Sequence, residues 1–325
     1  MTTKIYDPLV SLITEGIDTK KIISSYFPEW WDIGQNVHCP EHDDNLTLSF
    51  HIDPSGKAFC HGCGFSFSNI ISMVSYMEGL SYYEVRTMLY REVVNGIPDS
   101  KVDAFIKTLW MKSKKNKLSY LLDKRGLTQE IIRKYKLGVE PKAGSITIPI
   151  YDRYGACRNI RYMNHTKRCK AINEKGFGEV RLFPEANLVL EKKIVLVEGE
   201  YDCLVGRCHG LPTVTWTGGC MSWNDELTPL FKGKVVWLCY DTDEAGGRGV
   251  KQAYDKLKGV ASNILFVQGR DISKGKDMSD WHFSCPEFFD VLSKSIKAYS
   301  APIIEPIKKG KCPTCGHILN EPKVC

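Results

Sequence analysis

The clearest pattern in the sequence is an alternation of short apolar runs with helical stretches, which begins at residue 193. Uninterrupted apolar runs of this length are typical of strands buried on both faces, as in a parallel sheet. Helices between such strands predict a doubly wound α/β domain over 193–300, in which ligands bind at the carboxyl ends of the strands. The runs are KIVLV, PTVTW, KVVWLCY and NILFVQ, and the helical stretches lie near 201–208, 245–258 and 286–297.

The rest of the chain divides where this pattern changes. Over 118–192, the runs SITIPI, ACRNIRYM and KRCKAI alternate like strands joined by turns, and with helical stretches beside them they predict an α+β subdomain. The polar run KSKKNK within 93–117 is typical of a solvated linker. Residues 1–35 predict a short helical lead-in, 36–92 a β module followed by two short helices, and 301–325 a Pro- and Lys-rich tail.

The composition is that of a globular protein, with 43% hydrophobic and 25% charged residues in a chain of 325. No stretch approaches the roughly 20 uncharged apolar residues of a membrane span, and the N-terminus lacks the features of a signal peptide. We therefore expect a cytoplasmic protein that does not enter membranes. The 13 cysteines are odd in number and several have Cys-x-x-Cys or Cys-x-x-His spacing, which favours metal ligation over disulfides.

Charge is distributed unevenly along the chain. The net charge is +6, but residues 101–181 hold 20 Lys and Arg against 7 Asp and Glu. The remaining chain is therefore acidic overall. A basic segment beside an acidic one indicates a track for a polyanion next to a site for cations.

A dense Cys and His cluster lies in the β module. Cys39 and His42 form Cys-x-x-His, and Cys60 and Cys63 form Cys-x-x-Cys. Four such ligands predict a closed tetrahedral Zn²⁺ site with a structural role. The alternative is free core thiols beside a surface histidine. Between the pairs, LTLSFHID and GKAFC alternate like two strands of a ribbon.

Acidic residues follow the apolar strands of the α/β domain. Glu198 and Asp202 come after the first strand, and Asp241 and Asp243 after the third. Carboxyl ends of parallel strands meet at one edge, so these carboxylates predict a site for Mg²⁺ or Mn²⁺, which prefer hard oxygen ligands. Ordinary charged loops are the alternative. A third cluster, GKDMSDW, adds Asp277 and Asp280.

The run CPEHDDNLTLSFHIDPSGKAFCHGCG, followed by SNIISMVSYMEGLSYYEV, resembles the zinc ribbon of bacterial-type DNA primases and the helix after it. In that family the ribbon helps to select the template site at which a primer starts. The resemblance makes Lys57, Phe59 and His61 candidates to contact single-stranded DNA through charge and base stacking. Packing beneath the zinc is the alternative for the aromatic residues.

A glutamate after one strand and Asp-x-Asp after a later one resembles the Toprim domain, which primases share with topoisomerases, some nucleases and recombination mediators. This resemblance implies that Glu198 is the general base or metal organiser and that Asp241 and Asp243 bind one or two Mg²⁺. Asp202 would tune or extend that site, as would Asp277 and Asp280.

The basic block also resembles the primase core. The segment that opens the primase core is similar to residues 120–139, YLLDKRGLTQEIIRKYKLGV. The primase segment that supplies basic residues is similar to the run GACRNIRYMNHTKRCKAINEKGFGEVRLF. The resemblance implies that basic residues of this block contact nucleotide and template. Tyr162 and His165 alternate with them and could stack on bases. A lysine-guarded sheet edge is the alternative. The candidate basic residues are Arg161, Lys167, Arg168 and Lys170.

Taken together, the resemblance covers roughly 36–297 and implies a primase that joins ribonucleoside triphosphates into RNA primers on single-stranded DNA during replication. The sequence has no G-x-x-x-x-G-K-[ST] phosphate loop, so we expect the replicative helicase to be a separate chain, as in a phage or mobile-element system. A strand-cleaving Toprim nuclease or topoisomerase and a non-catalytic recombination mediator are the alternatives. A possible second zinc site in the tail comprises Cys312, Cys315, His317 and Cys325.

Overall fold

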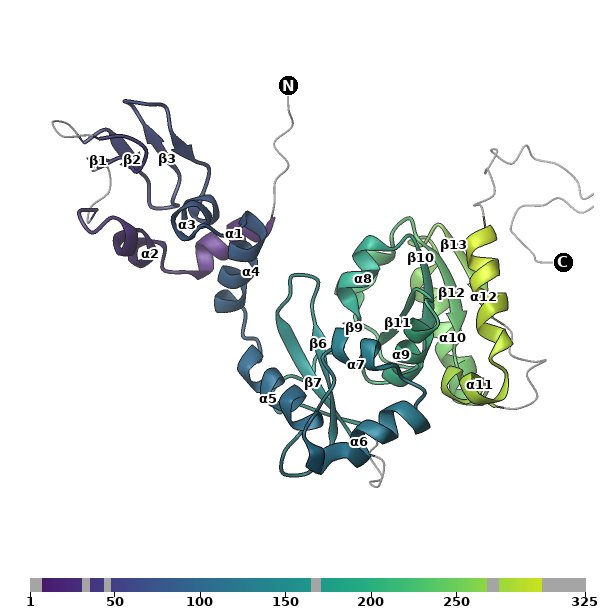
Figure 1. The fold of residues 1–325 in the computed structure, drawn as a ribbon. Coiled ribbons are helices and arrows are strands. Elements are labelled where there is room, and N and C mark those ends of the chain that lie inside the picture. Colours follow the sequence, from purple (N-terminus) through teal and green to yellow (C-terminus); the bar gives the residue numbers. More distant parts are fainter. Residues whose placement is uncertain (1–7, 31–35, 44–47, 165–170, 268–274, 300–325) are drawn as a thin grey trace, which may run out of the picture.

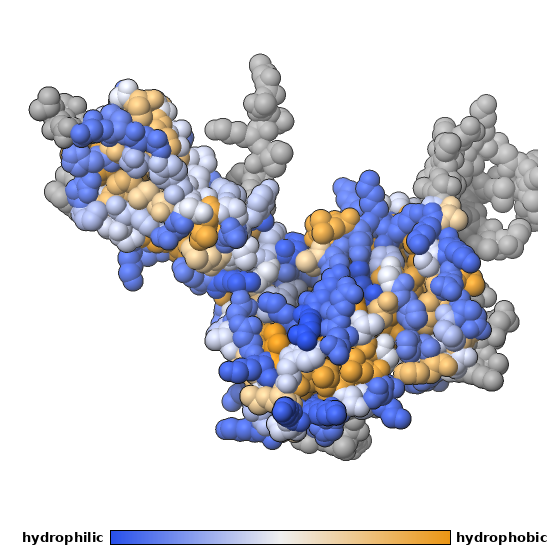
Figure 2. Space-filling view, in the orientation of Figure 1, coloured by the Kyte–Doolittle hydropathy of each residue, from blue (hydrophilic) through white to orange (hydrophobic). Residues whose placement is uncertain are grey.

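The computed structural model describes residues 8–30, 36–43, 48–164, 171–267 and 275–299. It contains three sheets that follow one another along the chain. Figure 1 shows an N-terminal module at one end, a middle antiparallel sheet, and a C-terminal parallel sheet flanked by helices. On the face drawn in Figure 2, hydrophilic side chains cover most of the surface and apolar ones gather in separate patches. Within the described ranges, no helix is long and apolar enough to cross a membrane.

The C-terminal sheet has five strands and is the predicted doubly wound sheet. Its strands, in spatial order, are β13 (Asn263–Phe266), β12 (Val235–Cys239), β10 (Lys193–Val197), β11 (Thr213–Trp216) and β9 (Leu182–Phe183). β10 pairs in parallel with β11 and β12, and β12 pairs in parallel with β13. Both faces of β10, β11 and β12 are buried, which explains their uninterrupted apolar runs, whereas the edge strand β13 is partly exposed. The predicted α/β fold class is confirmed.

Helices cover both faces of this sheet because successive strand residues point in opposite directions. Val195 and Trp237 pack on one side with α9, α11 and α12, whereas Ile194 and Val236 pack on the other with α8, α10 and a 3₁₀ helix. The helices are α8 (Glu185–Leu190), α9 (Glu200–Cys208), α10 (Glu244–Leu257), α11 (Met278–Ser284) and α12 (Glu287–Ala298), and the 3₁₀ helix is Asp225–Phe231.

One edge of the sheet differs from the prediction. β9 pairs antiparallel with β11, so Phe183 lies opposite Thr215 and Leu182 opposite Trp216. The strand therefore joins the C-terminal sheet, although its sequence lies within the predicted 118–192 subdomain. A strand of two residues is too short to produce a periodic pattern, which is why the sequence did not reveal it.

The middle sheet is antiparallel, with the order β5-β6-β7-β8. Its strands are β5 (Gly138–Val139), β6 (Ile146–Tyr151), β7 (Cys157–Met163) and β8 (Ala171–Asn173). α6 (Lys115–Ser119), a π-helical turn (Tyr120–Lys124) and α7 (Gln129–Lys134) precede it. Ile146, Ile148 and Ile150 share one hydrophobic cluster with β10 and α9, so the middle subdomain and the C-terminal domain have a continuous core.

The expected linker over 93–117 is helical instead. α5 (Asp99–Leu109) and a 3₁₀ turn (Lys112–Lys114) occupy it. Val102 and Phe105 of α5 pack against Cys157 and Ile160 of β7. The run KSKKNK suggested a linker because its lysines lie at the surface of the short helices after α5, whereas the buried face belongs to α5 itself.

The N-terminal module includes the segment expected to be a separate lead-in. Its four strands, β1 (Asn36–Val37), β2 (Phe50–Ile52), β3 (Ala58–Cys60) and β4 (Ser66–Phe67), form an antiparallel sheet. Ile13 and Ile23, from the first two helices, are fully buried in one cluster with Phe50 and Ile71. The lead-in therefore covers the ribbon. The helices are α1 (Pro8–Gly16), α2 (Thr19–Tyr26), α3 (Ile70–Glu78) and α4 (Tyr82–Val93).

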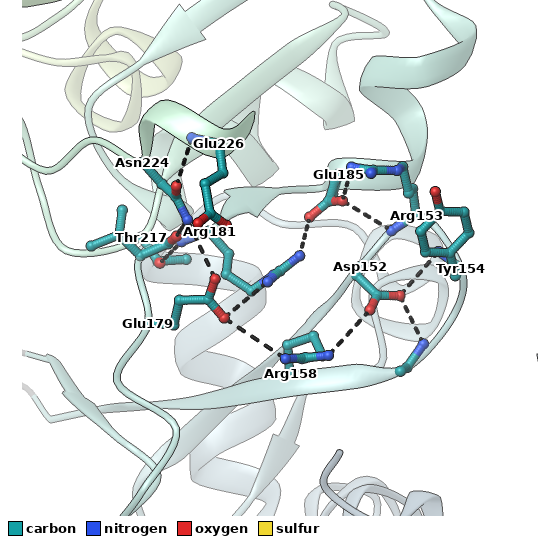
Figure 3. Close-up of polar contacts among 12 residues, drawn as sticks. Asp152, Arg153, Tyr154, Arg158, Glu179, Arg181, Glu185, Thr217, Asn224 and Glu226 are labelled. Carbon is teal, nitrogen blue, oxygen red and sulfur yellow. Dashed lines mark hydrogen bonds and ion pairs between the residues drawn. The ribbon is translucent and has the colours of Figure 1, made fainter. Parts of the chain in front are cut away.

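The module contacts the middle sheet through the end of α4. The Tyr90 hydroxyl donates a 2.9 Å hydrogen bond to Asp152, which is only 2% exposed, and the Arg91 Nε donates to the Gly155 carbonyl at 2.9 Å. Asp152 begins a chain of alternating charges that Figure 3 shows crossing toward the C-terminal domain. The chain continues through Arg158, Glu179, Arg181, Glu185 and Arg153.

Replacing Tyr90 with phenylalanine should loosen this contact. A hydrogen bond to a buried charge contributes about 1.5–3 kcal/mol, so opening of the module should become roughly tenfold more frequent or more. Amide hydrogen exchange over 93–98, the segment between module and core, measures the effect. Tyr83→Phe is the control, because Tyr83 is 68% exposed. Equal exchange rates in the two variants would show that the hydroxyl does not hold the module in place.

Candidate functional site

The four predicted zinc ligands meet in the N-terminal module. The ligand atoms of Cys39, His42, Cys60 and Cys63 all lie within 4.8 Å of one another. The Cys39 and Cys63 sulfurs are 3.7 Å apart. Two sulfurs bound to Zn²⁺ at about 2.3 Å with tetrahedral angles would be separated by roughly 3.8 Å. The Cys-His-Cys-Cys cluster is confirmed, and its geometry fits a tetrahedral metal ion.

Main-chain amides and a hydroxyl group favour the thiolate form of Cys60. The Gly62 and Cys63 amides point at the Cys60 sulfur at 3.3 and 3.4 Å, and the Ser49 hydroxyl lies 3.1 Å from it. Burial raises the pKa of Cys60, but these groups outweigh burial and lower the pKa to about 6. Thiolate is the form that binds a metal, so the turn favours ligation at neutral pH.

The acidic residues lie at one edge of the parallel sheet, as predicted. Glu198 directly follows β10, and Asp241 and Asp243 follow β12. Asp243 is the N-cap of α10 and accepts a 2.9 Å hydrogen bond from the Gly246 amide. A Cβ on Gly246 would lie 2.0 Å from the Asp241 carbonyl oxygen, so only glycine permits this tight turn.

The electrostatics of this edge favour a cation. The Oε2 atom of Glu198 is buried and has no hydrogen-bond partner among the described residues. Burial, and then the charge of Asp243, raise the pKa of Glu198. Burial, and then the charge of Glu198, raise the pKa of Asp241 to about 6. The positive charge of Lys276 lowers the pKa of both carboxyls, but burial and the neighbouring negative charges outweigh it, so a further cation would stabilise their ionised forms.

Three other predicted acidic residues have protein partners. Asp202 is partly buried and accepts hydrogen bonds from the amide and hydroxyl of Ser279, at 3.1 and 2.8 Å. Burial, and then the charge of Asp277, raise the pKa of Asp202 to about 7. Asp277 caps α11 by accepting from the Asp280 amide at 2.7 Å. Asp280 is exposed and accepts from the Lys276 amide. Asp202 and Asp277 line a cavity of about 330 Å³, and Asp280 does not.

Two observations indicate that the acidic edge fits a divalent cation. Its possible ligands are carboxylate oxygens, and the Oε2 atom of Glu198 has no partner among the described residues. Among the described residues, the zinc cluster is the one group of three or more His, Cys, Asp or Glu side chains placed to hold a metal ion by themselves. Mg²⁺ commonly takes only one or two protein carboxylates and completes its shell with water and phosphate oxygens. Glu198, Asp241 and Asp243 could hold such an ion in that way.

The predicted basic residues divide into two groups. Arg161 is 7% exposed, and its Nε donates to Glu200 at 2.7 Å, so its charge is already paired inside the protein. The others, Lys167, Arg168 and Lys170, lie outside the described residues, as do the tail residues Cys312, Cys315, His317 and Cys325.

Two cationic residues near the acidic edge were missed by the sequence interpretation. Arg125 lines the cavity beside Asp202, with its guanidinium 4.1 Å from the centre of the Tyr201 ring. Lys276 lies 3.4 Å from Asp241 and 3.6 Å from Asp243. Arg125 belongs to the run YLLDKRGL and Lys276 to the run GKDMSDW. Their places within these two motifs could have indicated that they lie near the site.

Comparison with known proteins finds similarity to DNA primases. Residues 195–282 match the Toprim-like family. Over 79% of its own length, this chain is 26% identical to the DNA primase of Thermotoga maritima. Over 80% of its own length, it is 24% identical to the DNA primase of Aquifex aeolicus. It spans 56% and 61% of those proteins. A structure of the zinc-binding and RNA polymerase domains of Aquifex aeolicus primase aligns with a TM-score of 0.48 and 20% identity, over 90% of this chain and 85% of that one. These sequence matches confirm the predicted resemblance to the bacterial-type DNA primases, with a Toprim-like domain.

Proposed function

We propose that this chain synthesises short RNA primers from ribonucleoside triphosphates on a single-stranded DNA template during DNA replication. It would be a DNA-directed nucleotidyltransferase that requires Mg²⁺ or Mn²⁺. The observation that carries the proposal is the buried, unpartnered Oε2 atom of Glu198 beside Asp241 and Asp243, at the strand ends of a Toprim-like domain. The similarity to DNA primases selects this reaction from those that the domain supports.

The acidic edge supplies the groups that nucleotide addition needs. A divalent cation held there would neutralise the triphosphate and favour the ionised 3′ hydroxyl. The free oxygen of Glu198 can accept a proton, because burial raises the pKa of this carboxyl toward neutrality. Asp241 and Asp243 would hold the cation. Arg125, in the adjoining cavity, provides a positive charge for a phosphate group.

The N-terminal module supports contact with the template. Phe59 on β3 is 47% exposed, and its ring meets that of His61 edge to face at 5.3 Å. An exposed aromatic pair beside Lys57 offers stacking and charge to an unpaired strand. In this proposal Zn²⁺ bound by the four-residue cluster keeps the ribbon folded. Lys167, Arg168 and Lys170 would contact nucleotide or template, and a replicative helicase would act as a separate chain in the cytoplasm.

A primer-synthesis assay tests the proposal directly. Labelled ribonucleoside triphosphates and mixed-sequence single-stranded DNA should give short products that require both the template and Mg²⁺. The double variant Asp241→Asn, Asp243→Asn should give none, whereas Asp255→Asn, on the exposed part of α10, should behave as the parent does. Template nicking without synthesis would favour the nuclease reading. Binding of DNA with neither reaction would favour a non-catalytic clamp.

A further inference from the structure

Lys276 lies in front of the two aspartates that follow β12. Its Nζ is 3.4 Å from an Asp241 oxygen and 3.6 Å from an Asp243 oxygen. One ammonium group therefore offsets part of the negative charge of the two carboxylates to which the proposed function assigns a divalent cation. The charge of Asp241 is the main cause that raises the pKa of Lys276, so the lysine remains charged at neutral pH.

The main chain fixes Lys276 at this place. Its carbonyl accepts a 2.9 Å hydrogen bond from the amide of Thr242, the residue between the two aspartates. Its own amide donates to Asp280 at 3.0 Å. The backbone of Lys276 is thus tied to the same turn as its charge partners. This contact also links Asp280 to the lysine.

The side chain of Lys276 is nevertheless free to leave. It is 55% exposed, and both of its carboxylate contacts are longer than a close ion pair. Asp241 is much less exposed, at 13%, so the carboxylate stays in place when the lysine moves. An ammonium and a divalent cation repel each other, and they cannot both occupy the space between the two aspartates.

We propose that Lys276 is a built-in counter-ion of the acidic edge, which offsets part of the negative charge of Asp241 and Asp243 in the metal-free protein and is displaced when a divalent cation binds. The lysine then lowers the affinity for the cation and stabilises the protein in its absence. This inference rests on the proposed function only in assigning a divalent cation to these carboxylates.

Titration with Mn²⁺ alone tests the competition. The full chain, loaded with zinc and free of nucleotide and DNA, is titrated while free Mn²⁺ is followed by electron paramagnetic resonance. Lys276→Met should bind Mn²⁺ about three- to fivefold more tightly, which is the scale of one partly exposed ion pair. It should also unfold at a lower temperature than the parent when no Mn²⁺ is added. Lys276→Arg keeps the charge and should remain near the parent in both measurements.

Lys258→Met is the matched control. Lys258 is 58% exposed and pairs with Asp255 at 2.6 Å, away from the acidic edge, so its loss should not change Mn²⁺ affinity. Unchanged or weaker binding in Lys276→Met would overturn the counter-ion role. If the parent and an Asp241→Asn variant bind Mn²⁺ equally, the metal assignment itself fails, and that result is separate from any effect of the lysine.

Discussion

Replacing Glu198 with glutamine should lower nucleotide addition by about 10²–10⁴-fold, the range that one general base contributes. The same change should raise the unfolding temperature of the protein without added Mg²⁺. Glu198 has a buried oxygen with no partner among the described residues, and burial and Asp243 both raise its pKa. Glutamine carries no charge, and its amide can donate to the neighbouring carboxylates. Function and stability should therefore change in opposite directions, as at a site kept for catalysis.

Two measurements check this expectation, a primer-synthesis rate and a thermal melt. Glu226→Gln is the control, because Glu226 is exposed and stands in the 3₁₀ helix before β12 rather than at the acidic edge. It should change neither result. A Glu198→Gln variant that keeps its rate would remove the proton-accepting role from Glu198. A variant that melts earlier than the parent would show that the native carboxylate is already well satisfied.

The sequence was informative where each strand was buried on both faces. The four apolar runs from 193 became β10 to β13, with helices on both sides. β10, β11 and β12 leave no exposed face to interrupt the pattern, and only the edge strand β13 is partly exposed. That topology places Glu198 and Asp241 at one edge. Cysteine and histidine spacing predicted the zinc cluster equally well, because a tight turn fixes the positions of two ligands three residues apart.

Features that depend on contacts between distant segments could not be predicted. β9 is too short to show a period, and the buried face of α5 was hidden by the lysines after it. Arg161 resembled a solvent-facing phosphate ligand, but Glu200, 39 residues away in sequence, pairs with it in the interior. Only the fold brings these two charges together, so the paired state of Arg161 cannot be deduced from its neighbours. The domain boundaries and the roles of individual site residues stay predictions.

Replacing Cys60 with alanine should remove one zinc ion per chain and unfold the N-terminal module. Metal binding by such a site contributes on the order of 10 kcal/mol or more to folding in small zinc domains. Cys60 also lies on β3, opposite Phe50 in the centre of the module core. Loss of the ion would therefore release the ribbon strands and the aromatic cluster that they position. Zinc content per chain and amide exchange over 36–92 measure the two effects.

Cys285→Ala is the appropriate control, because Cys285 is a partly exposed free thiol outside the cluster. It should keep the zinc content of the parent. Comparing the two variants isolates this ion from any metal that the tail cysteines bind. The parallel sheet should remain folded in Cys60→Ala, because its core is a separate set of residues from that of the module. Unchanged zinc content would exclude Cys60 as a ligand. Simultaneous unfolding of the sheet would show that the Tyr90 and Asp152 contact couples module and core far more strongly than one hydrogen bond accounts for.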